Sequence, residues 1–156
     1  MNCLVCGDPT IKLILEDEKI YWECRRCLFI SLDSIYRLSS SEAKNRYEQH
    51  NNDIHDKGYR LFLSKLFTPL KDELKDGAQG LDFGCGPGPA LAEMFKEEGY
   101  KVDLYDPFFF DNKKIFSKKY DFIACTETLE HFFEPMEELK RMDKMLVKGG
   151  LLGVMT

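Results

Sequence analysis

The 156-residue sequence lacks any apolar run that approaches the roughly 20 residues a helix needs to cross a bilayer. Its N-terminus has neither a basic segment followed by an apolar stretch nor the composition of a transit peptide. Internal repeats and low-complexity tracts are also missing. With 44% hydrophobic residues, the chain can bury one good core and a small appendage. We therefore expect a globular cytoplasmic protein without membrane association.

Positive charge is also scarce, with 22 Lys and Arg against 27 Asp and Glu and a net charge of -5. Because nucleic-acid binding draws its affinity from clustered Lys and Arg, this balance argues mildly against a large nucleic-acid footprint. The dense basic runs, Arg25-Arg26 and residues 113–119, are short and typical of a solvated surface.

The most informative motif is Leu-Asp-Phe-Gly-Cys-Gly-Pro-Gly at residues 81–88. A short apolar strand enters a glycine loop, with a carboxylate two residues before the first glycine. A dinucleotide fingerprint places its third glycine where Pro89 stands, whereas here Gly88 comes one residue early. The spacing therefore predicts a cofactor cradle of another kind.

Charge narrows the choice of cofactor. A carboxylate at Asp82 would repel a pyrophosphate but would favour a ligand that carries an ammonium and a sulfonium. Gly84 and Gly86 would leave no side chain between backbone and ligand, and Pro89 fits the first turn of a helix that continues to Gly99. With these residues the sequence resembles the class I methyltransferases that use S-adenosylmethionine.

Downstream segments extend the resemblance over about residues 76–156. Residues 101–105 predict a second strand ending in Asp106, where a carboxylate can accept both ribose hydroxyls. Residues 120–125 predict the next core strand, and the block Thr-Glu-Thr-Leu-Glu-His that follows is similar to the family's fourth-strand motif. The alternation predicts an α/β fold, a Rossmann-like and mostly parallel sheet with flanking helices and right-handed crossovers.

A further helix and strand are expected near the end of the sequence. Pro135 can open a helix with Met136, Leu139, Met142 and Leu146 on one face, ended by Gly149-Gly150 before an apolar strand at 151–155.

The resemblance also implies site residues. The expected cofactor-binding residues are Asp82, Gly84, Cys85, Gly86, Gly88, Asp106, Pro107, Phe108, Thr126 and Glu127. Glu127 would receive the ammonium group of the cofactor or hold the loop. His131 is the candidate general base, with a role in shaping the loop as an equal alternative.

Four cysteines form a second signal, because Cys3-x-x-Cys6 and Cys24-x-x-Cys27 have the spacing of a structural zinc site. Two such turns can close a tetrahedral thiolate shell that leaves no position for water. Iron is the main competing metal, while disulfides and redox-active thiols fit less well. Strands at 11–15 and 20–22 would complete a ribbon too small to fold without its metal.

Two helices are expected between these units: one at 41–49 and an amphipathic one from about Asp56 towards Pro69, with Leu61, Leu63, Leu66 and Phe67. In the family, leading helices often close over the methionine end of the cofactor. This implies Tyr47, His50, His55 and Tyr59 as candidates to line the site, although ordinary packing explains each of them singly. The expected division is a zinc ribbon at 1–38, a helical linker or lid at 39–75 and a cofactor-binding core at 76–156.

The sequence departs from the family pattern in two places. Too few residues separate Asp106 from Tyr120 for the usual helix and strand, so we expect the edge strand to be reduced or missing. Of Phe108, Phe109 and Phe110, at least one should wall the adenine and two should pack as core. The sequence also ends at Thr156 without the final hairpin, which predicts a C-terminally truncated core whose strand at 151–155 needs cover from more chain, a second copy or another partner.

These features together predict a methyltransferase that uses S-adenosylmethionine and carries a structural zinc. A small-molecule acceptor is favoured over RNA or protein because of the acidic balance. The alternative is a non-catalytic scaffold that keeps the cofactor fold and docks a partner through the ribbon.

Overall fold

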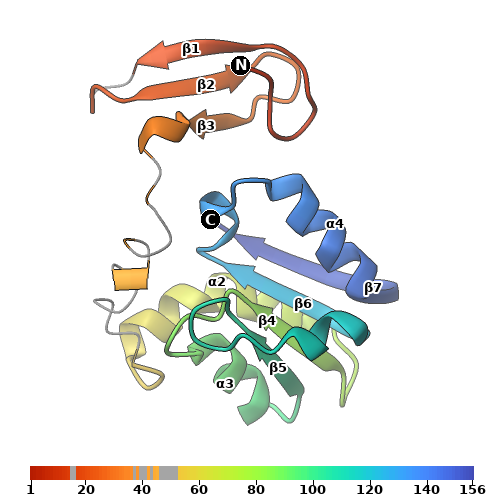
Figure 1. Ribbon diagram of the computed structural model, residues 1–156. Coiled ribbons are helices and arrows are strands. Elements are labelled where there is room, and N and C mark those ends of the chain that lie inside the picture. The colour runs from red at the N-terminus through yellow and green to blue at the C-terminus, as the bar shows by residue number, and fades with distance from the viewer. Residues whose placement is uncertain (15–16, 37, 39–41, 43, 46–52) are drawn as a thin grey trace.

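The computed structural model describes residues 1–14, 17–36, 38, 42, 44–45 and 53–156. It contains two separate sheets (Figure 1). The N-terminal sheet is antiparallel, in the order β1 (Thr10–Ile14), β2 (Ile20–Cys24), β3 (Ile30–Leu32), and the short 3-10 helix η1 (Ser34–Tyr36) follows it. Within this part, β3 was not predicted, because three residues are too few to show an alternating pattern.

The larger sheet consists of β4 (Gln79–Phe83), β5 (Lys101–Tyr105), β6 (Tyr120–Thr126) and β7 (Leu146–Met155). Its order is β5-β4-β6-β7 and every pairing is parallel. This confirms the predicted Rossmann-like α/β class.

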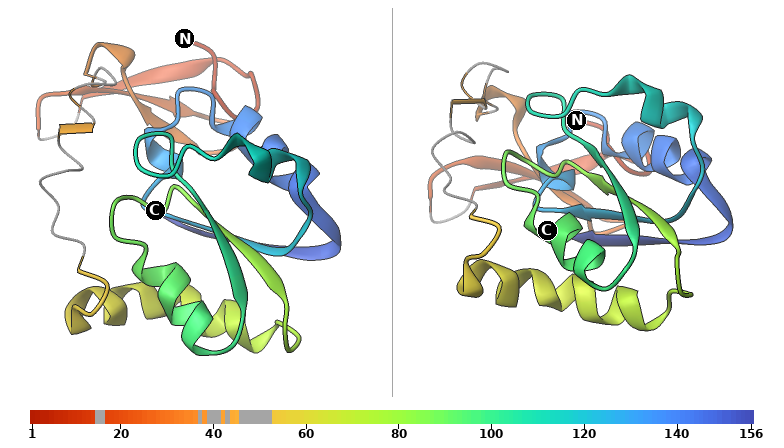
Figure 2. Two further views of the ribbon diagram at one scale, coloured as in Figure 1. Left: turned by 60° about the horizontal axis from the view of Figure 1, so that its bottom comes forward. Right: turned by 90° about the horizontal axis from the view of Figure 1, so that it is seen from below.

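Helices cover both faces of the larger sheet. The helices α2 (Lys57–Asp72) and α3 (Ala90–Glu97) lie on one face, and α4 (Pro135–Met145) lies on the other together with the 3-10 helix η2 (Lys113–Ser117) (Figure 2). The alternation along β6 produces this arrangement, since Phe122 joins the core under α2 and α3 while Ile123 joins the core under α4. A last 3-10 helix, η3 (Leu129–His131), follows β6.

Helix α2 is longer than expected. Asp56 caps it by accepting a hydrogen bond from the Tyr59 N–H (2.6 Å), and the helix continues past Pro69 to Asp72. The buried side chain of Leu70 explains this extension, because it packs over Gly153 of β7, where an added Cβ would lie 2.9 Å from Leu70 Cδ2. Of the apolar residues named for this helix, Leu63, Leu66 and Phe67 are buried, whereas Leu61 is 73% exposed.

The boundary between α4 and β7 also differs from the prediction. The helix ends at Met145, and β7 begins at once with Leu146, so Leu146 belongs to the strand and Gly149-Gly150 lies inside it. Tyr120 pairs with Leu146 but Phe122 pairs with Leu151, so β7 bulges between these pairs. Gly149 has φ +80 at this bulge, a conformation that glycine adopts easily.

The segment between β5 and β6 is short, as predicted. Residues 106–119 are all described and contain η2 but no strand, so β5 is one edge of the sheet and β7 is the other. The expectation that two of Phe108, Phe109 and Phe110 pack as core was wrong, because all three are half-buried. Instead, Ile115 of η2 is fully buried beneath this edge.

The predicted helix at 41–49 lies largely outside the described residues, of which it includes only Glu42, Lys44 and Asn45. Tyr47 and His50 are likewise outside them. Among the helices that are described, none combines the length and apolar character needed to cross a membrane.

Candidate functional site

The glycine loop after β4 is held at its start by backbone hydrogen bonds. The N–H groups of Gly84 and Cys85 donate to the carbonyl oxygen of Tyr105 at the end of β5 (2.8 and 3.2 Å). Gly84 and Gly86 have φ of +81 and +62, which only glycine adopts without strain. Thr128 braces the loop from the other side, because its Oγ1 donates to the Gly84 carbonyl oxygen (3.1 Å). An added Cβ at Gly84 would lie 2.3 Å from Thr128 Cγ2.

Asp106 connects the glycine loop to the turn that follows β5. Its Oδ2 accepts a hydrogen bond from the Gly86 N–H (3.1 Å), and its Oδ1 accepts from the N–H groups of Phe108 (2.8 Å) and Phe109 (3.2 Å). The residue is 7% exposed. Oδ1 thus uses both of its acceptor positions, whereas Oδ2 can accept one further hydrogen bond, so the group is both fixed in place and able to bind a ligand hydroxyl.

Asp82 lies beneath the loop and is only 3% exposed. Its pKa is raised to about 7, mainly by burial and also by the charge of Asp106, while the backbone N–H of Ala92 in α3 acts in the opposite direction. A cation placed above this side chain would favour its ionised form. The neighbouring Cys85 thiol is also buried, and burial raises its pKa, so it is not a reactive thiolate.

A single cleft of about 1410 Å³ opens at the carboxyl ends of β4, β5 and β6 and extends to the N-terminal sheet. All ten residues predicted to bind the cofactor line it, and so does His131. The structure therefore brings the predicted residues together, while their individual ligand contacts stay predictions.

Helix α2 supplies one wall of this cleft. Tyr59 lines it, and burial together with the charges of Asp82 and Glu127 raises the pKa of its hydroxyl. Of the other aromatic and histidine candidates before the core, His55 is described but is not part of the cleft lining.

The segment after β6 forms the opposite wall. Glu127 has φ +50, its N–H donates to the Met155 carbonyl oxygen (2.8 Å), and its exposed side chain lines the cleft. His131, in η3, has a side chain that is 54% exposed, with Nε2 3.9 Å from a carboxylate oxygen of Glu130.

Sequence reasoning missed two contributions to the site. Thr128 belongs to the block that was recognised after β6, but its contact with the Gly84 backbone depends on how β4 and β6 pair. The N-terminal unit contributes Ile30 and Leu32 of β3, and Phe29 just before it, to the cleft. No local signal marks these residues, because their place depends on how the two sheets lie together.

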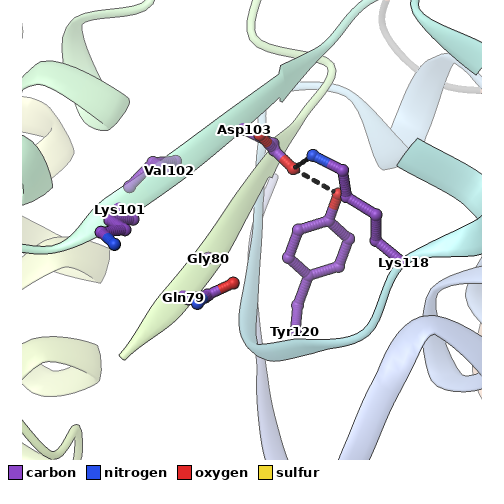
Figure 3. A pocket seen from close by; sticks show the side chains of 7 residues that line it. All are labelled: Gln79, Gly80, Lys101, Val102, Asp103, Lys118 and Tyr120. Carbon is purple, nitrogen blue, oxygen red and sulfur yellow. Dashed lines mark hydrogen bonds and ion pairs between the residues drawn. The ribbon is translucent and has the colours of Figure 1, made fainter. Parts of the chain in front are cut away.

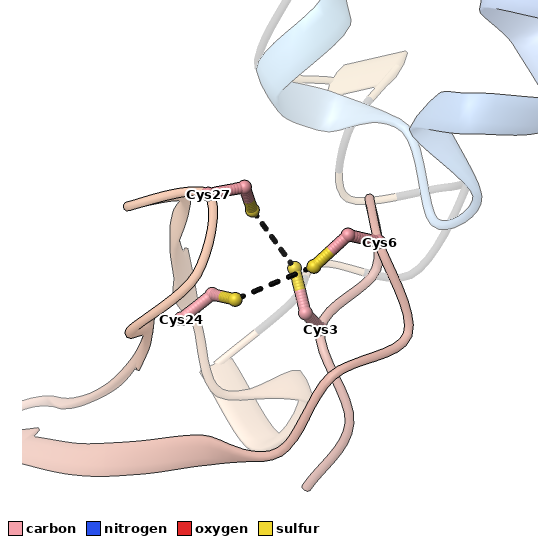
Figure 4. Close-up of side chains that lie close together, drawn as sticks. All are labelled: Cys3, Cys6, Cys24 and Cys27. Atoms are coloured by element: carbon pink, nitrogen blue, oxygen red, sulfur yellow. Dashed lines mark hydrogen bonds between the residues drawn. The ribbon is translucent and has the colours of Figure 1, made fainter.

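The four cysteines of the N-terminal sheet converge (Figure 4). The Sγ atoms of Cys3 and Cys27 are 3.5 Å apart, those of Cys6 and Cys24 are 3.4 Å apart, and all four lie within 4.8 Å of one another. Four sulfurs at about 2.3 Å from a tetrahedral zinc would be about 3.8 Å apart, so the cluster fits such an ion. It offers four ligands and no open position for water.

A smaller hollow of about 350 Å³ lies at the opposite ends of the strands (Figure 3). Here Asp103 accepts hydrogen bonds from Lys118 Nζ (2.6 Å) and Tyr120 Oη (2.8 Å). Burial alone would raise the pKa of Asp103, but these two partners hold it below the usual value. The ion pair and hydrogen bond give this carboxylate a structural role, away from the larger cleft.

A parallel sheet with a glycine loop between a strand and the next helix, and a cleft at the carboxyl ends of its strands, is typical of α/β proteins that bind nucleotide-like ligands. The model of the methyltransferase domain family matches residues 50–156, and the chain belongs to this family.

Two methyltransferases are among the solved structures that are similar to this chain. One is coclaurine N-methyltransferase bound to N-methylheliamine and SAH (20% identity, TM-score 0.44, covering 69% of this chain and 38% of that one). The other is SAM-bound CalS10, an amino pentose methyltransferase from Micromonospora echinaspora involved in calicheamicin biosynthesis (20% identity, TM-score 0.45, covering 75% and 56%). The chain thus matches less than two thirds of the length of either protein. No curated protein sequence matches it significantly.

Proposed function

We propose that the chain binds S-adenosylmethionine in the large cleft and transfers its methyl group to a small-molecule acceptor. The observation that carries the proposal is Asp106, a buried carboxylate tied to the Gly86 N–H and still able to accept a further hydrogen bond at the cleft. Membership of the methyltransferase domain family supports it.

The proposed roles of the residues follow from their places. The remaining acceptor position of Asp106 Oδ2 would accept a ribose hydroxyl, and the lack of a side chain at Gly86 would allow close approach of the ligand, whereas the space beside Gly84 is filled by Thr128. Asp82 and Glu127 would favour the positively charged methionine end of the ligand.

When bound, S-adenosylmethionine would supply a methyl group on a positively charged sulfur. Because its leaving group is neutral, positioning and exclusion of water account for most of the catalysis. His131 lies on the cleft wall, where it would accept a proton from an acceptor that must lose one.

Calorimetric titration with S-adenosylmethionine and S-adenosylhomocysteine tests the cofactor site. Asp106→Ala should weaken binding by roughly 100-fold, because charged hydrogen bonds are worth about 1.5–3 kcal/mol each. Asp103→Ala is the matched control, since it removes an aspartate only three residues away, whose side chain lines the small hollow and not the large cleft. It should leave binding unchanged.

Thermal melts should accompany the titrations, because Asp106 also accepts three internal hydrogen bonds. Equal binding by the folded Asp106→Ala variant would refute the assigned role. A folded wild-type chain that binds neither ligand would instead favour the scaffold function.

We also propose that Cys3, Cys6, Cys24 and Cys27 hold one structural zinc ion. Their sulfur separations and closed set of four thiols support it. Elemental analysis after expression with both zinc and iron available should find about one zinc per chain. A coloured protein with one iron per chain would identify the competing rubredoxin-like site.

A further inference from the structure

The cleft is larger than one ligand requires. Pockets for drug-sized ligands measure about 300–1,000 Å³, whereas this cleft measures about 1410 Å³. The proposed cofactor residues lie around the glycine loop and the ends of β5 and β6, and the cleft continues from them to the N-terminal sheet. A second molecule therefore has room beside the cofactor, against that sheet.

The N-terminal sheet presents an apolar surface to this space. Of its described residues that line the cleft, Ser31 is the polar one, and the others are apolar or aromatic. Ile30 is 50% exposed and Tyr36 is 36% exposed, so both present apolar surface that a ligand could cover. The two arginines that follow β2, Arg25 and Arg26, do not line the cleft and so add no positive charge to it.

The charged groups of the facing wall are mostly acidic. Glu127, Glu130 and Glu134 line it, whereas its cationic side chain Arg141 is paired with Glu138 (2.9 Å). A phosphorylated acceptor or an RNA strand would meet repulsion here and would find few cations to neutralise it.

We propose that β3 and the adjoining η1 form the wall of the acceptor site and that Ile30 and Tyr36 select an apolar small molecule that carries no anionic group. This inference rests on the proposed function, since it locates the acceptor beside the cofactor cradle. It assigns the ribbon a part in recognition, in addition to its metal site.

Fluorescence titration with the uncharged probe N-phenyl-1-naphthylamine tests the proposal on the full metal-loaded chain saturated with S-adenosylhomocysteine. Ile30→Glu should weaken probe binding on the order of tenfold, because a carboxylate replaces apolar contact surface. Ile14→Glu is the matched control, because Ile14 is 66% exposed on the same sheet but does not line the cleft. This control should bind the probe like the wild type.

Both variants should bind S-adenosylhomocysteine normally, which separates the acceptor wall from the cofactor site. Tyr36→Ser provides a second test if Ile30→Glu disturbs the ribbon, as Trp22 fluorescence would reveal.

Normal binding of S-adenosylhomocysteine without saturable probe binding overturns the inference alone, as does an equal loss of probe binding in Ile14→Glu. Absence of S-adenosylhomocysteine binding overturns the proposed function and the inference together. Tight, salt-sensitive binding of a labelled RNA 20-mer would also overturn the apolar assignment.

Discussion

The N-terminal ribbon and the parallel core obtain their order from different sources. Among the described residues of the ribbon, the buried side chains are Cys3, Cys24 and Ser31, and two of these belong to the cysteine cluster. The core instead buries an apolar cluster on each face of its sheet. With the proposed zinc bound, the ribbon would depend on a metal crosslink, whereas the core depends on removing apolar surface from water.

The two regions also differ in how far apart in sequence their contacts lie. The ribbon pairs neighbouring strands, β1 with β2 and β2 with β3, while the core brings β4 between β5 and β6. Such local pairing allows the ribbon to open separately from the core. The protein's single tryptophan, Trp22, lies in the ribbon and donates from Nε1 to Asp33 Oδ2 (2.7 Å), so its fluorescence reports this region alone.

Breaking the metal site should produce the largest difference between the two regions. Cys24→Ser should abolish tight metal binding and unfold the ribbon at 25 °C, because structural zinc supplies roughly 10–16 kcal/mol to such small units. Trp22 fluorescence should shift to that of an exposed indole, while the core keeps its cooperative thermal transition. Elemental analysis and circular dichroism measure the two effects.

Cys125→Ser is the control for a lost thiol, because Cys125 is fully buried in β6 of the core. It should keep the metal and lower the stability of the core by about 1–3 kcal/mol, through burial of a hydroxyl. If Cys24→Ser retained both the metal and the native Trp22 signal, the comparison would be wrong.

A rise in pH should change the stability of the core and of the ribbon in opposite directions. Burial raises the pKa of Asp82 to about 7, so the folded core binds a proton more tightly than the unfolded chain. Its stability should fall by about 3 kcal/mol as the pH rises from 5 to 8. In the ribbon, hydrogen bonds from the Ile35 N–H and then Trp22 lower the pKa of Asp33, so this group loses its contribution as the pH falls.

Urea unfolding of Asp82→Asn at pH 5 and pH 8 measures the core effect. The variant should lose most of the pH dependence, because an amide does not titrate. Asp103→Asn should retain it, since the pKa of Asp103 is lowered and not raised. A wild-type core with equal stability at both pH values would contradict the assignment to Asp82.

Substitution of a loop glycine should have a smaller effect on stability, and it tests how tightly the glycine loop packs against Thr128. Gly84→Ala should lower the free energy of unfolding by about 2–3 kcal/mol, from the left-handed backbone together with the clash against Thr128. Gly77→Ala should lower the free energy of unfolding by only about 1 kcal/mol, from the left-handed backbone alone, because Gly77 has φ +74 and open space around it.

Denaturant unfolding and calorimetry with S-adenosylhomocysteine distinguish the two glycine variants. Only Gly84→Ala should lose ligand binding, because Gly77 lies far from the cleft lining. Equal destabilisation by the two substitutions would show that Thr128 yields to the added methyl group.

The bounds of a helix or strand were predicted correctly where the residues that determine them lie within or next to that segment. The strand at 101–105 was predicted at its observed bounds, because its turn signals and apolar residues lie within the segment itself. The end of α2 was not, because packing of Leu70 against Gly153 outweighs the local helix-breaking effect of Pro69. The start of β7 was missed for a similar reason, since pairing with Tyr120 extends the strand through two glycines.

The sequence by itself determined the fold class, the glycine loop and the spacing of the four cysteines, because each is encoded by residues close together in the chain. Only the tertiary structure decided that Thr128 braces Gly84, that Asp106 holds the Gly86 N–H, and that the ribbon faces the cleft. These contacts join segments that are 20 or more residues apart. They depend on strand order and on the packing of the two sheets, which no local pattern specifies.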